Sequence, residues 1–90
     1  MTTNHSKILI NLKKVNSLTL RIIKMVEDKK YCIDIMQQNL AVIGLLKSVH
    51  QMVMEGHLNS CFRRAMSSKD EKLKQEMINE ILRLSKTSNK

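Results

Sequence analysis

The fold of this 90-residue chain is decided by residues 31–66, which read YCIDIMQQNLAVIGLLKSVHQMVMEGHLNSCFRRAM. The stretch contains both glycines of the chain, and the chain has no proline. A run of this length without a strong helix breaker predicts one long helix. Gly56 marks the only place where we expect an interruption.

Two shorter helical patterns flank this stretch. Residues 6–26 carry apolar side chains at steps of three and four, which is typical of one helix face; they are Ile8, Leu12, Val15, Leu18, Ile22 and Met25. Residues 71–84 repeat the pattern with Leu73, Met77, Ile81 and Leu84. We therefore predict an all-α, three-helix protomer with a long central helix, forming a single domain over residues 1–90.

The ends of these helices carry recognisable signals. Ser6 and Asp70 are of the residue types that cap helix N-termini, and we expect them to begin the first and third helices. Residues 85–90 are polar, so we expect a frayed C-terminal tail.

Composition excludes several classes of protein. With two glycines, no proline and two aromatic residues, the chain cannot supply the turns of a β-sandwich, a glycine-rich phosphate loop or an aromatic platform for stacked bases. No apolar run approaches the ~20 residues of a membrane span, and no signal-peptide core is present. These absences predict a cytoplasmic protein with no membrane partner, in which both thiols stay reduced.

The two cysteines and one histidine share a face of the central helix. At about 100° per residue, His57 and Cys61 each lie within roughly 20° of Cys32 around the axis, on opposite sides of it, but about 37 Å of helix separates Cys32 from His57. A second copy, antiparallel about a two-fold axis near residues 45–46, would bring Cys32 beside the partner's His57 and Cys61. Between them the face is mostly apolar, and we name it the seam; it consists of Met36, Asn39, Ile43, Leu46, His50 and Met54.

The sequence thus permits two identical intersubunit sites in a homodimer. Two thiolates and one imidazole suit soft ions, copper(I) above all, with nickel(II) and zinc(II) as alternatives. Zinc would require a fourth ligand. The competing interpretation is that each cysteine is an ordinary apolar-face residue without a ligand role.

Residues 7–84 resemble the CsoR/RcnR/FrmR family of small helical repressors, which sense copper, nickel or cobalt, formaldehyde or reactive sulfur. The most specific stretches are YCIDIMQQ at residues 31–38 and GHLNSC at residues 56–61. The resemblance implies that Cys32 of one protomer and His57 and Cys61 of its neighbour are trigonal copper(I) ligands. It also implies a flat tetramer and a supporting shell around the ligands, made by Tyr31 and a glutamate that is Glu76 or, with a shifted alignment, Glu80.

The first helix is strongly basic. The chain has 16 Lys and Arg against 8 Asp and Glu, a formal net charge of +8, which favours an acidic partner such as double-stranded operator DNA. The residues we expect to bind DNA are Lys13, Lys14 and Arg21, with Arg63 and Arg64 as a second cluster. This chain departs from the family's first-helix motif, because Asn11 replaces an arginine and Ser17-Leu18 replaces Gly-Gln. Since lysine acts as a point charge where arginine reads guanine, this departure predicts an atypical operator, a greater dependence on phosphate contacts, or loss of DNA binding.

Together these features predict a homotetrameric repressor that binds operator DNA when metal-free. Copper(I) would release it and derepress metal-efflux or detoxification genes. The alternatives within the family are a reactive-sulfur sensor that joins Cys32 to Cys61 and a nickel sensor with His5 as an additional ligand. A helical metal-binding protein without DNA binding is the alternative outside it. An enzyme is not expected, because no set of nucleophile, base and orienting residue is present.

Overall fold

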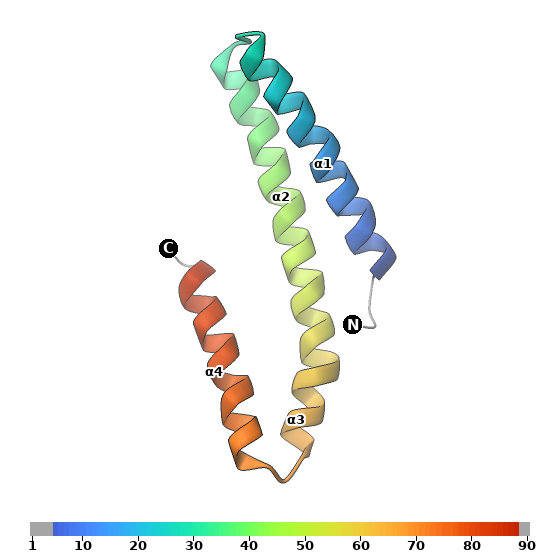
Figure 1. The fold of residues 1–90 in the computed structure, drawn as a ribbon, viewed down its shortest axis with the longest axis vertical. Coiled ribbons are helices and arrows are strands. Elements are labelled where there is room, and N and C mark those ends of the chain that lie inside the picture. Colours follow the sequence, from blue (N-terminus) through green and yellow to red (C-terminus); the bar gives the residue numbers. More distant parts are fainter. Residues whose placement is uncertain (1–4, 89–90) are drawn as a thin grey trace.

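The computed structural model describes residues 5–88, and every regular element in that range is helical, which confirms the all-α prediction. Helix α1 (His5–Glu27) runs antiparallel to α2 (Cys32–His57), as Figure 1 shows. A π-helical turn, η1 (Leu58–Phe62), and a short helix, α3 (Arg63–Ser67), extend α2 into one rod. Helix α4 (Glu71–Ser88) then turns back toward the C-terminal half of α2, on the side away from α1.

The α1–α2 hairpin packs along positions that alternate by three and four residues, the spacing of a coiled coil. On α1 these inward positions are buried or half-buried: Ile8, Asn11, Val15, Leu18, Ile22 and Met25. Our assignment of Leu12 to this face was wrong, since Leu12 is 40% exposed. Asn11 takes the position instead, and its Nδ2 donates a 3.4 Å hydrogen bond to the hydroxyl of Ser48 on α2.

The turn between α1 and α2 is a Schellman motif built on a lysine. The backbone N–H of Lys30 donates to the carbonyl of Met25 at 2.9 Å, and that of Lys29 donates to Val26 at 3.1 Å. Lys29 has φ 55°, the left-handed conformation that this motif requires at its turning residue. A side chain there is strained, because only glycine adopts this conformation without steric cost.

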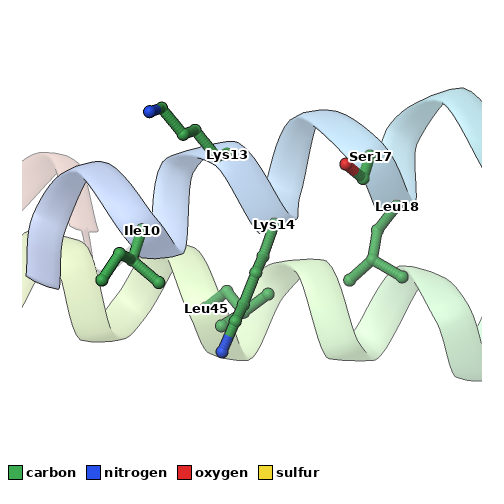
Figure 2. A pocket seen from close by; sticks show the side chains of 6 residues that line it. All are labelled: Ile10, Lys13, Lys14, Ser17, Leu18 and Leu45. Atoms are coloured by element: carbon green, nitrogen blue, oxygen red, sulfur yellow. The ribbon is translucent and has the colours of Figure 1, made fainter.

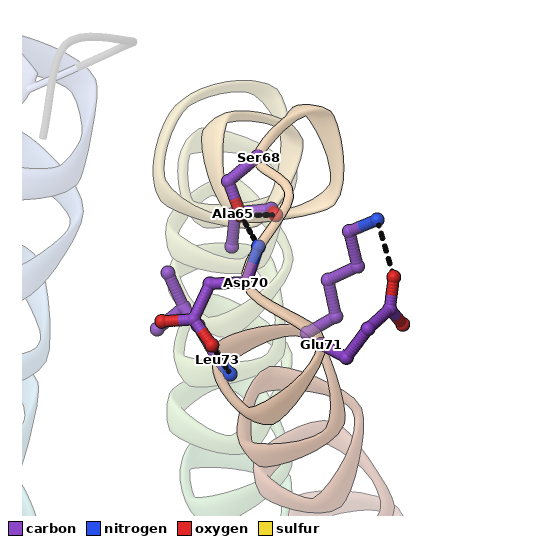
Figure 3. Close-up of polar contacts among 6 residues, drawn as sticks. Ala65, Ser68, Asp70, Glu71 and Leu73 are labelled. Atoms are coloured by element: carbon purple, nitrogen blue, oxygen red, sulfur yellow. Dashed lines mark hydrogen bonds and ion pairs between the residues drawn. The ribbon is translucent and has the colours of Figure 1, made fainter.

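Asp70 caps α4 as predicted. Its Oδ1 accepts the backbone N–H of Leu73 at 3.1 Å, and the preceding Ser68 hydroxyl donates to the carbonyl of Ala65 at 2.7 Å (Figure 3). These bonds satisfy backbone groups that the ends of α3 and α4 leave without helical partners.

Two sequence-based helix ends were wrong. Helix α1 begins at His5, so Ser6 lies within its first turn and does not cap it. Helix α4 continues through residues 85–88, which we expected to be frayed. Polarity there indicates exposure rather than a helix end, because the segment contains no glycine or proline to stop the helix. Residues 89–90 of the predicted tail lie outside the described range.

The rod formed by residues 32–67 departs from a regular α-helix just beyond Gly56. The backbone N–H of Arg63 donates both to the carbonyl of Leu58, five residues back as in a π-helix, and to the carbonyl of Ser60. The interruption that we expected at Gly56 is therefore a widened turn at residues 58–62, two residues later. The rod continues through this turn.

The protomer is a single layer of helices. It measures 58 × 29 × 14 Å, with a radius of gyration of 17.7 Å, whereas a compact chain of this length has about 12 Å. It exposes 7212 Å², against about 5400 Å² for a compact monomer of its mass. Among the described residues, Ile8 and Ala65 are the buried hydrophobic ones. A layer this thin leaves its apolar faces uncovered unless a second layer packs on it.

No helix within residues 5–88 combines the length and the apolar character needed to cross a membrane.

Candidate metal centre and nucleic-acid surface

The first predicted ligand lies at the start of the long rod. Cys32 is the first residue of α2. Its side chain is exposed, and its thiol is free of any disulfide. Tyr31 immediately precedes the helix and is 67% exposed. Its carbonyl accepts the backbone N–H groups of Asp34 and Ile35 at 3.1 and 3.3 Å, which starts the helix directly at the cysteine.

The other two predicted ligands lie near the far end of the rod. His57 is the last residue of α2 and is half-buried, while Cys61 is exposed within the π-helical turn. The Ser60 hydroxyl lies 3.8 Å from the Cys61 sulfur and donates a 2.6 Å hydrogen bond to the carbonyl of Gly56. Sequence reasoning missed Ser60. The available signal was a serine four residues after a glycine, a spacing that permits this bond to the backbone.

One protomer does not bring the three ligands together. Within residues 5–88, no three His, Cys, Asp or Glu side chains gather closely enough to hold a metal ion. Cys32 and His57 lie at opposite ends of a 26-residue helix, about 37 Å apart along its axis. A site that uses all three residues therefore requires a second chain.

The seam between these ends is uncovered. Met36 is 59% exposed, Leu46 is 43% exposed, and Asn39, Ile43 and His50 are also exposed, whereas Met54 is half-buried. Helix α1 packs on a different face of α2, the one that carries the half-buried Leu45. The face that joins Cys32 to His57 thus remains free for another helix.

A groove of about 330 Å³ separates α4 from the end of α2 that holds His57. Its lining includes His50, Met54 and His57 from α2, and Glu80 and Leu84 from α4. Glu76, the glutamate we first matched to the family's supporting carboxylate, lines a neighbouring hollow with Asn79, Glu80 and Arg83 instead. In this structure the glutamate that shares a groove with His57 is Glu80.

The predicted DNA-binding residues are all exposed and belong to α1 and α3; they are Lys13, Lys14, Arg21, Arg63 and Arg64. Figure 2 is a close-up view of two of these residues. Lys14 extends across Leu45 toward α2, while Lys13 points away from α2. Arg63 and Arg64 begin α3, directly after the π-helical turn that holds Cys61. The second basic cluster thus lies at the end of the rod that carries His57 and Cys61, and the first cluster lies along α1.

Asn11, which replaces an arginine of the family's first-helix motif, has a defined place in the structure. Asn11 is half-buried and bonded to Ser48, so it lies in the hairpin interface rather than on the basic outer surface. His5, the additional ligand of the nickel alternative, is the first residue of α1 and is exposed.

The donor set fits a soft monovalent ion. Two cysteine sulfurs and an imidazole provide three soft or borderline ligands. Copper(I) accepts such a three-ligand set, whereas structural zinc takes four ligands.

Comparisons with known proteins agree with this chemistry. A family model described as "metal-sensitive transcriptional repressor" matches residues 4–87. The copper-sensing transcriptional repressor RicR of Mycobacterium tuberculosis is 38% identical over 56 residues, which cover 62% of this chain and 58% of that protein. The copper-sensing transcriptional repressor CsoR of Mycobacterium bovis is 32% identical over 66 residues, 73% of this chain and 56% of that protein. The chain thus spans a little over half the length of these relatives.

A solved structure is similar over the whole chain. The copper-sensing repressor CsoR of Geobacillus thermodenitrificans, crystallised with Cu(I), superimposes with a TM-score of 0.85 at 29% sequence identity. The match covers 100% of this chain and 91% of the other. Both the helices and their arrangement are therefore shared with that protein.

Proposed function

Because the chain belongs to the family of metal-sensitive transcriptional repressors, we propose that it is a copper(I)-responsive repressor of transcription acting as a single domain in the cytoplasm. The metal-free assembly binds operator DNA upstream of metal-efflux or detoxification genes. Binding of copper(I) at Cys32, His57 and Cys61 lowers the affinity for DNA and starts transcription.

One observation carries this proposal: the ligands lie at the two ends of a helix whose intervening face is apolar and uncovered. Two such helices packed antiparallel along the seam would cover Ile43 and Leu46, and would set Cys32 of each chain against His57 and Cys61 of the other. The large exposed area of the protomer supports this pairing, because a stable interface buries about 800 Å² on each partner. Pairing two such dimers gives the proposed homotetramer.

Each residue of the site has a separate task. Cys32, His57 and Cys61 would hold copper(I), which supplies a bond between helices of two chains. Tyr31, next to Cys32, and a glutamate of α4 would orient the ligands through hydrogen bonds, as supporting residues of metal sites do. Glu80 is the better candidate for the glutamate, because it shares a groove with His57.

The basic surface supplies the affinity for DNA. Four chains carry four times the +8 of one, a field that attracts the phosphate backbone without any base-reading module. Arg63 and Arg64 directly follow the π-helical turn that holds Cys61. A change in the backbone of that turn would therefore move both arginines directly. Because the coupling is reciprocal, bound DNA must weaken copper affinity by the same factor by which copper weakens DNA affinity.

A titration of His57→Ala tests the proposal, with His50→Ala as its matched control on the same helix face. Fluorescence anisotropy with the gene's own promoter DNA, under anaerobic conditions, should show release by copper(I) for the wild type and for His50→Ala but not for His57→Ala. An undiminished copper response in His57→Ala, with release by polysulfide, would identify a sulfur sensor instead. Release by nickel(II) or zinc(II) in preference to copper(I) would identify a different metal, and the absence of a salt-sensitive DNA complex would identify a metal-binding protein without DNA binding.

A further inference from the structure

The π-helical turn at Leu58–Phe62 directly follows His57 and contains Cys61. Such turns are rare within α-helices and recur at functional sites. In a regular α-helix a step of four residues overshoots a full turn by about 40°. A π turn is wider and closes its hydrogen bond over five residues, so His57 and Cys61 come closer to one line along the helix.

Ser60 lies within this turn and contacts both the backbone and the cysteine. Its hydroxyl donates a 2.6 Å hydrogen bond to the carbonyl of Gly56 and lies 3.8 Å from the Cys61 sulfur. A hydroxyl on this carbonyl competes with the backbone N–H that an α-helix would place there. The bond thus favours the widened turn over the regular one.

Thr19 makes the same kind of bond as Ser60, from its hydroxyl to the carbonyl four residues back, and the comparison shows how Ser60 differs. The Thr19 hydroxyl donates to the carbonyl of Val15 at 2.7 Å, and α1 stays regular there. At Ser60 the acceptor belongs to a buried glycine, the residue type with the lowest helix propensity after proline. The hydroxyl bond and the weak helix former together account for a π turn at this place in the rod.

We propose that Ser60 is a positioning residue for the metal site: its bond to Gly56 holds the π turn that sets where the Cys61 sulfur lies relative to His57. The inference rests on the proposed function, since it concerns the ligands of that site. It adds a residue that need not touch the metal and whose effect passes through the backbone.

Three variants test this inference: Ser60→Ala removes the hydroxyl, Ser60→Thr keeps it, and Thr19→Ala removes the equivalent bond from a regular helix. Crystal structures of the metal-free variants report whether the Arg63 N–H still donates to the Leu58 carbonyl, five residues back. Competition with a chromophoric chelator under anaerobic conditions reports copper(I) affinity, and thermal unfolding reports whether each variant is folded.

We expect metal-free Ser60→Ala to bond Arg63 N–H four residues back, and its copper(I) affinity to fall about 10-fold or more, the usual effect of removing a residue that orients a metal ligand. Ser60→Thr and Thr19→Ala should keep both the π turn and the wild-type affinity. A folded Ser60→Ala that retains the π turn, or that binds copper(I) as tightly as the wild type, overturns the inference alone. A wild-type protein that binds no copper(I) overturns the proposed function and this inference with it.

Discussion

His57 of α2 and Glu80 of α4 line one groove, although they belong to helices that run in opposite directions and are joined at the far end of the rod. Glu76, one helical turn earlier on α4, lines a different hollow. We therefore predict that Glu80→Gln weakens copper(I) affinity by about 10- to 100-fold, because the carboxylate no longer orients a ligand. Glu76→Gln is the matched control, with near wild-type affinity expected by chelator competition. The reverse ranking of the two variants would show that the groove does not identify the supporting carboxylate.

DNA affinity should depend on Lys13 in a salt-sensitive manner. The Lys13 side chain points away from α2 and is exposed, so its charge is available to a phosphate. Lys13→Gln should weaken binding to all DNA sequences alike and lower the slope of log affinity against log salt by about 1 for each phosphate that is no longer neutralised. The same substitution at Lys86, in the last turn of α4, should leave the slope unchanged, as measured by anisotropy from low to high salt. Equal slopes for wild type and Lys13→Gln would remove Lys13 from the DNA surface.

The cap at Asp70 should contribute measurably to stability. Asp70→Ala removes the acceptor for Leu73 N–H and should cost about 1 kcal/mol. Asp28→Ala provides the comparison, because its ion pair with Lys24 is exposed, and such pairs contribute little. Urea unfolding at fixed protein concentration measures both, since stability depends on concentration in an oligomer. A decrease at Asp28 equal to that at Asp70 would argue against the cap.

The strained Lys29 offers a stabilising substitution. Lys29→Gly should raise the free energy of unfolding by about 0.5–1 kcal/mol, because glycine adopts the left-handed conformation without steric cost. Lys30→Gly, one residue later, should instead lower stability, since it only adds freedom to the unfolded chain. If both glycine variants destabilise the protein in thermal unfolding, the turn is not a Schellman motif in solution.

Much of the fold follows from the spacing of apolar residues, which is why the three helical segments could be predicted from the sequence. Details set by specific contacts could not. Hydropathy favoured Leu12 for the interface with α2, but strict alternation of three and four residues from Ile8 through Val15 to Leu18 selects Asn11, whose amide bonds Ser48. Polarity suggested fraying at residues 85–88, where the Thr87 hydroxyl in fact bonds back to the carbonyl of Arg83 within the helix.

The candidate site was predictable in outline for a similar reason. A period of 3.6 residues aligns Cys32 with His57 whatever the side chains between them do. The position of Cys61 depends on the π turn, which results from a single serine hydroxyl and a glycine and leaves no trace in the apolar pattern. The choice between Glu76 and Glu80 depends on how α4 folds back, which the sequence of α4 alone does not determine.

The central claim is that each metal site is shared by two chains, and mixing two defective chains tests it most directly. Cys32→Ser and Cys61→Ser are unfolded together, refolded as an equimolar mixture under anaerobic conditions, and titrated with copper(I) against a chelator. Each variant alone should bind none tightly, whereas a mixed dimer regains one complete site, so random pairing should restore about one site per four chains against about one per chain in the wild type. A mixture that binds no more copper(I) than its two components, beside a fully loaded wild type, would contradict the account.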